Sequence, residues 1–196
     1  MSVGIAVNIL WFVWYVTWIA AVIWSDKTKI QMKTDMGGLH RIVSNIGFLL
    51  LFVPTASIPP SWGVFAVLAR KVWNEPDWMA WSLFAFVGAS FGFCWWARRH
   101  LGRLWSGFVT LKEGHRVVDT GPYGLVRHPI YSGVMSAALA TALIRASPMA
   151  LTGFVLVVVG FAMTARIEEH FLREQLGADA YDAYRRRVPM LVPSMR

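Results

Sequence analysis

The sequence is poor in charged residues and in cysteine. Only 15% of its 196 residues are charged and 56% are hydrophobic, whereas a soluble domain averages about 25% charged and about 45–50% apolar residues. Cys94 is the single cysteine and lies in an apolar stretch, so we expect neither a disulfide nor a thiolate metal site, and no metal cofactor. These absences exclude an ordinary soluble domain and favour a membrane protein.

The apolar residues come in long blocks. Residues 3–24 and 78–97 carry no charge, and each approaches the roughly 20 residues that a helix needs to cross a bilayer. The first block lacks a basic n-region and is rich in tryptophan, so we predict a retained helix rather than a cleaved signal peptide.

Two further blocks are interrupted. Prolines divide the uncharged block 42–69, which predicts a span followed by an interfacial segment near Trp62–Leu68. Residues 129–165 are too long for one span and predict two short helices joined by a tight turn. We therefore expect one all-α membrane domain over residues 1–196, with a small cytoplasmic helical cap. Its five spans are predicted at about 3–24, 42–58, 78–97, 129–145 and 148–165, the last two forming a hairpin.

The basic residues predict the orientation. With five spans, residues 25–41, 98–128 and 166–196 share one side and hold 16 Lys and Arg, against 3 on the other side. The positive-inside rule then places the N-terminus outside and the C-terminus in the cytoplasm. This topology also accounts for the net charge of +8. We therefore expect contact with anionic membrane lipids and no nucleic-acid partner.

The first polar motif, Arg127 to Gly133, begins the hairpin. Pro129 suits the first position of a helix, and His128 before it is biased to extended geometry on the loop side, where a ligand can reach it. Gly133 permits close approach of a backbone or a flat ligand, and Arg127 is suited to bind a carboxylate or a lipid phosphate. The alternative is an ordinary basic helix start, with Tyr131 in the aromatic belt.

The second motif, Glu168-Glu169, closes the hairpin at the same face. Neighbouring carboxylates point about 100° apart on a helix, so at most one of them can face a bundle interior squarely. The alternative is a solvated helix on which Glu169 pairs with Arg166 and Arg173. Beyond this motif we expect a cytoplasmic helix over residues 166–188, broken at Gly177.

These motifs, in this order, resemble the isoprenylcysteine carboxyl methyltransferase family and the related membrane phospholipid N-methyltransferases. The resemblance covers about residues 98–196. It rests on Gly121-Pro122-Tyr123, Arg127-His128-Pro129-x-Tyr131-x-Gly133, Glu168-Glu169 and a tail with Leu172, Gly177, Tyr181, Tyr184, Val188-Pro189 and Val192-Pro193.

The resemblance implies a site for S-adenosylmethionine, taken from the cytosol, at the cytoplasmic face of the hairpin. It implies no Rossmann domain, and the sequence has no Gly-x-Gly-x-x-Gly signature. A lipid or prenylated acceptor would enter from the bilayer. The cofactor-binding residues implied are Tyr123, Val126, Arg127, His128, Pro129, Tyr131, Gly133, Glu168 and Glu169.

The catalytic residues implied are Arg187, Glu168 and Glu169. Arg187 would orient an ionised carboxylate acceptor, with Arg185 and Arg186 able to be confused with it or to compensate. An amine acceptor would instead need a base, for which the two glutamates are candidates.

Two other hypotheses stay open. Some membrane sterol reductases carry a similar motif and use NADPH, although the Glu-Glu pair and the short chain favour methyl transfer. A non-catalytic membrane accessory protein is the third. The acceptor, the glutamate that contacts the cofactor and the oligomeric state are not given by the sequence.

Overall fold

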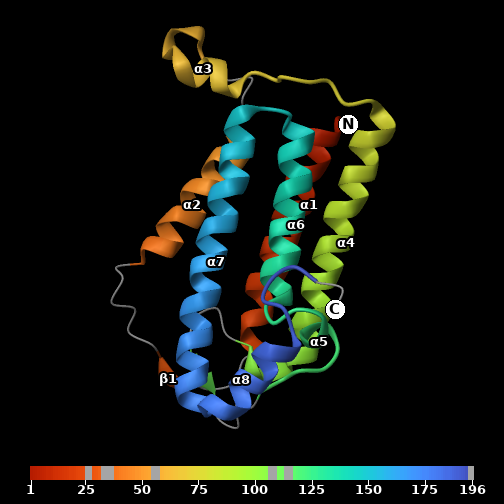
Figure 1. Ribbon diagram of the computed structural model, residues 1–196. Coiled ribbons are helices and arrows are strands. Elements are labelled where there is room, and N and C mark those ends of the chain that lie inside the picture. Colours follow the sequence, from red (N-terminus) through yellow and green to blue (C-terminus); the bar gives the residue numbers. More distant parts are fainter. Residues whose placement is uncertain (25–27, 32–37, 54–57, 106–109, 113–116, 194–196) are drawn as a thin grey trace.

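The structure, a computed structural model, describes residues 1–24, 28–31, 38–53, 58–105, 110–112 and 117–193. It is a helical bundle with one small sheet (Figure 1). The elements in chain order are α1 (Val3–Ala20), η1 (Ala21–Trp24), β1 (Thr28–Gln31), α2 (Leu39–Phe52), η3 (Pro60–Trp62), α3 (Val64–Ala69), α4 (Asp77–Leu101), η4 (Gly102–Leu104), β2 (Thr110–Lys112), α5 (Pro122–Leu125), α6 (Pro129–Arg145), α7 (Pro148–Leu176) and α8 (Ala178–Arg187).

The predicted all-α membrane fold is confirmed in its main features. Five long helices run along the bundle, and among the described residues α1, α4 and α7 are each long and apolar enough to cross a membrane. Helices α2 and α6 are shorter, with 14 and 17 residues. Helix α2 ends at Phe52, two residues before Pro54, because a residue that precedes proline avoids the helical conformation. Residues 54–57 of the predicted second span lie outside the described residues.

The sheet is a departure from the prediction. The prediction was an all-α fold with residues 25–41 and 98–128 outside the spans, but within these segments β1 pairs antiparallel with β2, with Ile30 opposite Leu111. Strands this short carry too few residues for an alternating pattern to be recognisable. The sheet brings the connection after α1 beside the connection after α4.

The predicted hairpin of the last two long helices is confirmed. Helix α6 ends at Arg145 and is followed by Ala146, whose backbone is left-handed with φ 53°. The Ser147 side chain then caps α7 by accepting a hydrogen bond from the Ala150 amide at 3.2 Å, and Pro148 occupies the first helical turn. This two-residue connection makes α6 and α7 antiparallel neighbours, so that the start of one lies beside the exit of the other.

Helix α2 packs closely on α7 through glycines. A Cβ added at Gly47 would lie 2.7 Å from the Val157 amide nitrogen, and one at Gly153 would lie 2.6 Å from the Gly47 carbonyl oxygen. Aromatic side chains fill the space between α1 and its neighbours, and the Trp11 indole donates to Thr141 Oγ1 of α6 at 2.9 Å. The bundle is therefore held by close backbone contacts on one side and by large rings on the other.

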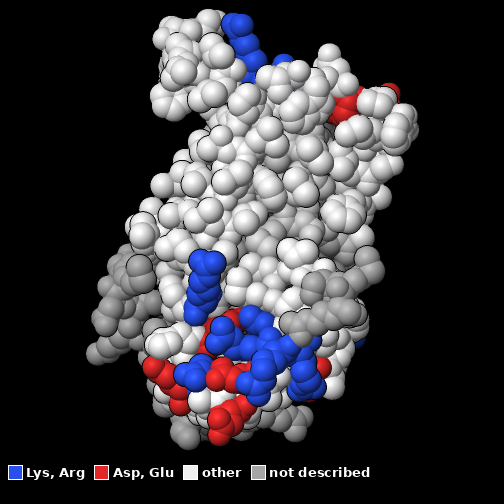
Figure 2. All heavy atoms as spheres, in the orientation of Figure 1, with Lys and Arg blue, Asp and Glu red and all other residues white. Residues whose placement is uncertain are grey.

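Charge is concentrated at one end of the bundle. In Figure 2 the Lys, Arg, Asp and Glu residues gather around the α8 end, while the middle of the visible face is uncharged. At the opposite end, η3 and α3 lie beyond the ends of the long helices, where α3 contacts α7, and they carry exposed apolar side chains, Trp62 and Val64 among them (Figure 1). This agrees with an integral membrane protein that has one strongly charged end and an apolar interfacial segment at the other.

Candidate functional site

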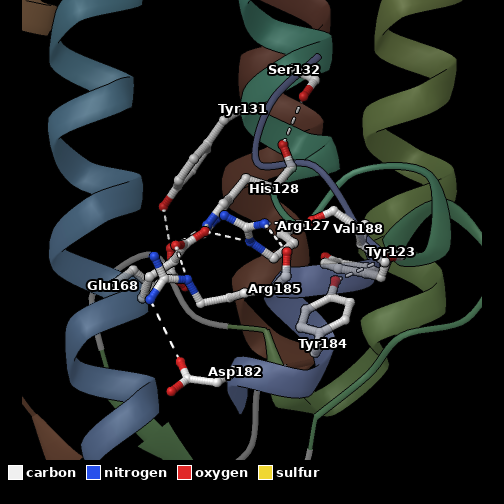
Figure 3. Close-up of polar contacts among 11 residues, drawn as sticks. Tyr123, Arg127, His128, Tyr131, Ser132, Glu168, Asp182, Tyr184, Arg185 and Val188 are labelled. Carbon is white, nitrogen blue, oxygen red and sulfur yellow. Dashed lines mark hydrogen bonds and ion pairs between the residues drawn. The ribbon is translucent and has the colours of Figure 1, made fainter. Parts of the chain in front are cut away.

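The two polar motifs meet at the charged end of the bundle. Arg127 and His128 precede α6, with His128 at its N-cap, and Glu168 and Glu169 lie on α7 near its C-terminal end. Figure 3 shows the side chains of Arg127, His128 and Glu168 pointing toward one another. Motifs that lie about 40 residues apart in sequence therefore form one cluster.

Glu169 lies at the centre of the basic groups in this cluster. Its side chain is 6% exposed, and its Oε1 accepts a hydrogen bond from Arg127 Nε at 2.7 Å. The same oxygen lies 3.2 Å from His128 Nε2, and Oε2 lies 3.4 Å from Arg185 Nε. Arg173, in contrast, pairs with Asp182 of α8. The arrangement differs from a solvated helix on which Glu169 pairs along α7 with Arg166 and Arg173.

Glu168 faces a different direction and different partners. Its side chain is 29% exposed, and its Oε2 accepts a hydrogen bond from the Tyr131 hydroxyl at 2.9 Å. The same oxygen lies 3.6 Å from His128 Nδ1. His128 therefore lies between the two carboxylates, and its ring stacks in parallel on Tyr131 with centroids 5.3 Å apart. Of the two glutamates, Glu168 has the weaker set of partners and the greater access.

The chain after α8 returns across the first motif. The Arg127 amide donates to the Pro189 carbonyl at 2.9 Å, and the His128 amide donates to the Met190 carbonyl at 3.1 Å. The Arg127 guanidinium also donates to the Val188 carbonyl, and the Ser132 hydroxyl to the Leu191 carbonyl. We call residues 188–193 the C-terminal strap. Its Val-Pro pairs belong to the resemblance, but these backbone contacts could not be predicted, because carbonyl acceptors leave no side-chain pattern.

A pocket opens beside this cluster. It contains about 820 Å³ of space not filled by atoms, part of it open to solvent. One end is polar and the other is apolar and aromatic. The polar end is formed by Arg127, His128, Tyr131 and Glu168, and the apolar end by Leu101, Leu104, Trp105, Val117, Val118, Leu172 and Leu176.

Three further tyrosines line the pocket. Tyr123, Tyr181 and Tyr184 are all buried, and the Tyr184 hydroxyl donates to the Tyr123 carbonyl at 2.8 Å. Burial raises the pKa of each of the three hydroxyls, so they are neutral near pH 7. They offer a ligand neutral rings and no charge.

A second, apolar groove lies on the other side of the first motif. It holds about 1100 Å³ of space, part of it open. Side chains of α4, α6 and α7 line it, together with Leu191, Val192 and Pro193 of the strap. Val126 and Gly133 face this groove rather than the polar pocket. The segment 126–133 and the strap therefore separate a polar pocket from an apolar groove.

The predicted site residues fall into two groups. The first group lines the pocket and consists of Tyr123, Arg127, His128, Pro129, Tyr131 and Glu168. Glu169 is outside this lining and contacts the Arg127 and His128 side chains. Gly133 packs against α4, since an added Cβ would lie 2.5 Å from Cys94 Sγ and 2.9 Å from the Ser90 carbonyl oxygen. Arg187 is 64% exposed and pairs with Asp119 at 2.8 Å. Its other hydrogen bond among the described residues is to the Ala183 carbonyl, and Arg185 takes the place beside Glu169.

The described residues contain no group of three or more His, Cys, Asp or Glu that could hold a metal ion. The chemistry available here is therefore that of carboxylates, an imidazole, guanidinium groups and phenols. These groups can bind the hydroxyl, ammonium and carboxylate groups of a ligand.

Comparison with known proteins finds similarity to one family of membrane methyltransferases over about half of the chain. Residues 82–174 match the model of the isoprenylcysteine carboxyl methyltransferase (ICMT) family. The chain is 34% identical over 95 residues to protein-S-isoprenylcysteine O-methyltransferase B of Arabidopsis thaliana, covering 47% of this chain and 48% of the relative. It is 36% identical over 86 residues to protein-S-isoprenylcysteine O-methyltransferase of Saccharomyces cerevisiae, covering 43% and 36%.

A third relative has a different kind of name. The nickel-cobalt-cadmium resistance protein NccN of Alcaligenes xylosoxydans xylosoxydans is 28% identical over 100 residues, covering 48% of this chain and 45% of the relative. The chain thus spans about half the length of the curated relatives it matches. The matched segment contains both polar motifs and the hairpin between them. Residues 82–174 are therefore similar to the isoprenylcysteine carboxyl methyltransferase family.

Proposed function

We propose that this protein is an integral membrane methyltransferase that transfers a methyl group from S-adenosylmethionine to the carboxylate of a prenylcysteine-type lipid acceptor. The observation that carries the proposal is the pairing of a polar pocket with an apolar groove on the two sides of segment 126–133. A reaction between a water-soluble donor and a lipid-like acceptor needs two such compartments next to each other.

The polar pocket suits the donor. Glu168, with a partly exposed carboxylate, can accept hydrogen bonds from ribose hydroxyls or from an ammonium group. The apolar end, with Trp105 and several aliphatic side chains, offers contact for a purine ring. Glu169 is already surrounded by three basic partners. We therefore assign donor binding to Glu168 and the positioning of Arg127 and His128 to Glu169.

The apolar groove suits the tail of the acceptor. It lies among α4, α6 and α7, the three helices that also carry or flank the pocket. An acceptor whose tail occupies this groove would present its polar head toward segment 126–133. Its apolar tail would then stay out of water throughout, because the tail would pass from the bilayer directly into the groove.

The charges of the donor and the acceptor determine what the protein has to contribute to the reaction. When bound, S-adenosylmethionine supplies the reactive methyl sulfonium, while the protein supplies alignment. A carboxylate acceptor is ionised at neutral pH and needs no base, so the protein has only to orient it. We propose that Arg187 does this after leaving Asp119, since an exposed ion pair of this kind is weak. We further propose that the site faces the cytoplasm and that the N-terminus lies outside, as the basic residues predict.

Methyl transfer from labelled S-adenosylmethionine to farnesylcysteine analogues and to membrane extracts tests the proposal. We expect a labelled product that releases its label in base, as a methyl ester does. A base-stable product would point to a phospholipid amine instead. Binding of NADPH without binding of S-adenosylhomocysteine would refute methyl transfer and favour a reductase.

A further inference from the structure

A buried arginine lies outside the two motifs. Arg98, in the last turn of α4, is 2% exposed. One of its terminal nitrogens donates to the Gly102 carbonyl at 2.7 Å, and the other donates to the Ala21 carbonyl at the end of α1, also at 2.7 Å. Its guanidinium carbon lies 4.1 Å from the centroid of the Trp105 ring. Arg98 therefore connects α1, the end of α4 and Trp105.

This burial needs an explanation, because an arginine removed from water is costly without a counter-charge. The terminal nitrogens of Arg98 donate to carbonyls and not to carboxylates, and its Nε has no hydrogen-bond partner among the described residues. The cost of burying its charge is offset by two carbonyl acceptors and by the face of one aromatic ring. The helix dipole at the C-terminus of α4 does not explain the burial, because an exposed basic residue such as the neighbouring Arg99 interacts favourably with the dipole without being buried.

Trp105 links this arginine to the polar pocket. Its side chain is 7% exposed and lines the apolar end of the pocket, together with Leu101 and Leu104 from the segment that Arg98 caps. Trp18 of α1 touches the Trp105 ring edge-on, with centroids 5.6 Å apart. The ring is thus held by Arg98 on its face and by Trp18 of α1 at its edge, which fixes this part of the pocket wall.

We propose that Arg98 is a positioning residue for the donor: it holds Trp105 as the rigid wall against which the purine ring rests. The inference rests on the proposed function. It extends the site beyond the family match, because Ala21 and Trp18 of α1 lie outside residues 82–174. In this way the N-terminal helix contributes to donor binding without touching the donor.

The test compares Arg98→Met with Arg99→Met, a matched change at the neighbouring exposed position. Titration with S-adenosylhomocysteine should show a dissociation constant about tenfold higher for Arg98→Met, the size expected for a lost desolvated cation–π contact. Arg99→Met should bind as the wild type does. The KM for the acceptor should stay within about twofold in both, because the groove residues are untouched.

A double-mutant cycle separates positioning from a general loss of structure. If Arg98 acts through Trp105, Arg98→Met combined with Trp105→Ala should bind S-adenosylhomocysteine no more weakly than Trp105→Ala alone. Arg98→Lys keeps the charge and should recover part of the affinity, although it cannot bind two carbonyls in the fork geometry of arginine. If Arg98→Met fails to fold, Arg98→Lys and Trp105→Phe, which retains an aromatic face, still give the comparison.

Failure of the proposed function and failure of the role of Arg98 give different experimental results. Wild-type protein that does not bind S-adenosylhomocysteine would refute the proposed function. Wild-type protein that binds it, together with unchanged affinity in Arg98→Met, or with effects of Arg98→Met and Trp105→Ala that simply add, would overturn the role of Arg98 alone.

Discussion

The adjacent glutamates are expected to respond in opposite ways to the same substitution. Glu169→Gln removes a carboxylate that is 6% exposed and that faces Arg127, His128 and Arg185. Glu168→Gln removes one that is 29% exposed and that accepts a hydrogen bond from Tyr131. The two changes are chemically identical and one residue apart, so each is the control for the other.

The magnitude follows from what is left behind. Without the Glu169 charge, the 9%-exposed Arg127 side chain keeps only carbonyl partners, and removing one partner of a buried ion pair costs about 3–5 kcal/mol. The glutamine oxygen can still accept one hydrogen bond, which places the expected loss near the lower figure, about 3 kcal/mol. For Glu168→Gln we expect less than about 1 kcal/mol, because the carboxylate is partly solvated and the amide oxygen can still accept from Tyr131.

Equilibrium unfolding in mixed micelles, followed by circular dichroism, measures both stability losses, and titration with S-adenosylhomocysteine measures donor binding. Glu169→Gln should lower the free energy of unfolding strongly. Glu168→Gln should fold normally but bind S-adenosylhomocysteine at least about tenfold more weakly, as expected for a lost charge-assisted hydrogen bond. If Glu168→Gln is the more destabilised variant, or if both bind the ligand equally well, the assignment of roles is wrong.

Three further predictions concern other parts of the structure. Gly133→Ala should destabilise the protein by about 1–3 kcal/mol, because its Cβ would meet Cys94 Sγ and the Ser90 carbonyl; Gly92→Ala, with no atom within 4 Å of its Cβ, is the control, and equal unfolding of the two would contradict the packing role. Arg187→Met should raise the KM for a carboxylate acceptor at least about tenfold without changing S-adenosylhomocysteine affinity, and Arg70→Met at the opposite end should do neither. The hydrogen bond from Arg173 lowers the pKa of Asp182, so the pair contributes fully above the unfolded pKa of about 3.9 and is lost as the pH falls through the lower folded pKa. The protection factors of the α8 amides, which correct for the pH dependence of intrinsic exchange, should therefore be higher at pH 7 than at pH 3, and low at both in Asp182→Asn; identical protection factors in that variant would refute the contribution.

The bundle was predictable because hydropathy and charge act on many residues at once. The uncharged blocks located α1, α4 and the hairpin, and the divided block 42–69 gave both α2 and the exposed segment around α3. The polar cluster was also predictable, since two helices joined by a two-residue turn must bring the start of α6 beside the exit of α7. What local pattern could not supply was the pairing of distant chain segments. The sheet between β1 and β2 depends on such a pairing, and so does the strap along Arg127 and His128.

The same distinction explains why the individual roles of site residues were not readable. Glu168 and Glu169 are identical in type and adjacent in sequence, and Arg185 and Arg187 are only two apart. Their surroundings differ because α7 rotates successive side chains by about 100° and because α8 turns Arg185 toward Glu169 while Arg187 meets Asp119. Arg98 is a stronger case: in sequence it is one of two adjacent basic residues at the end of an apolar block, where topology alone would account for both. Only the packing of α1 against α4 buries one and leaves the other exposed. A residue that acts through contacts with backbone carbonyls and a ring, as Arg98 does, has no motif, and it is found by asking which buried charge the fold has to compensate.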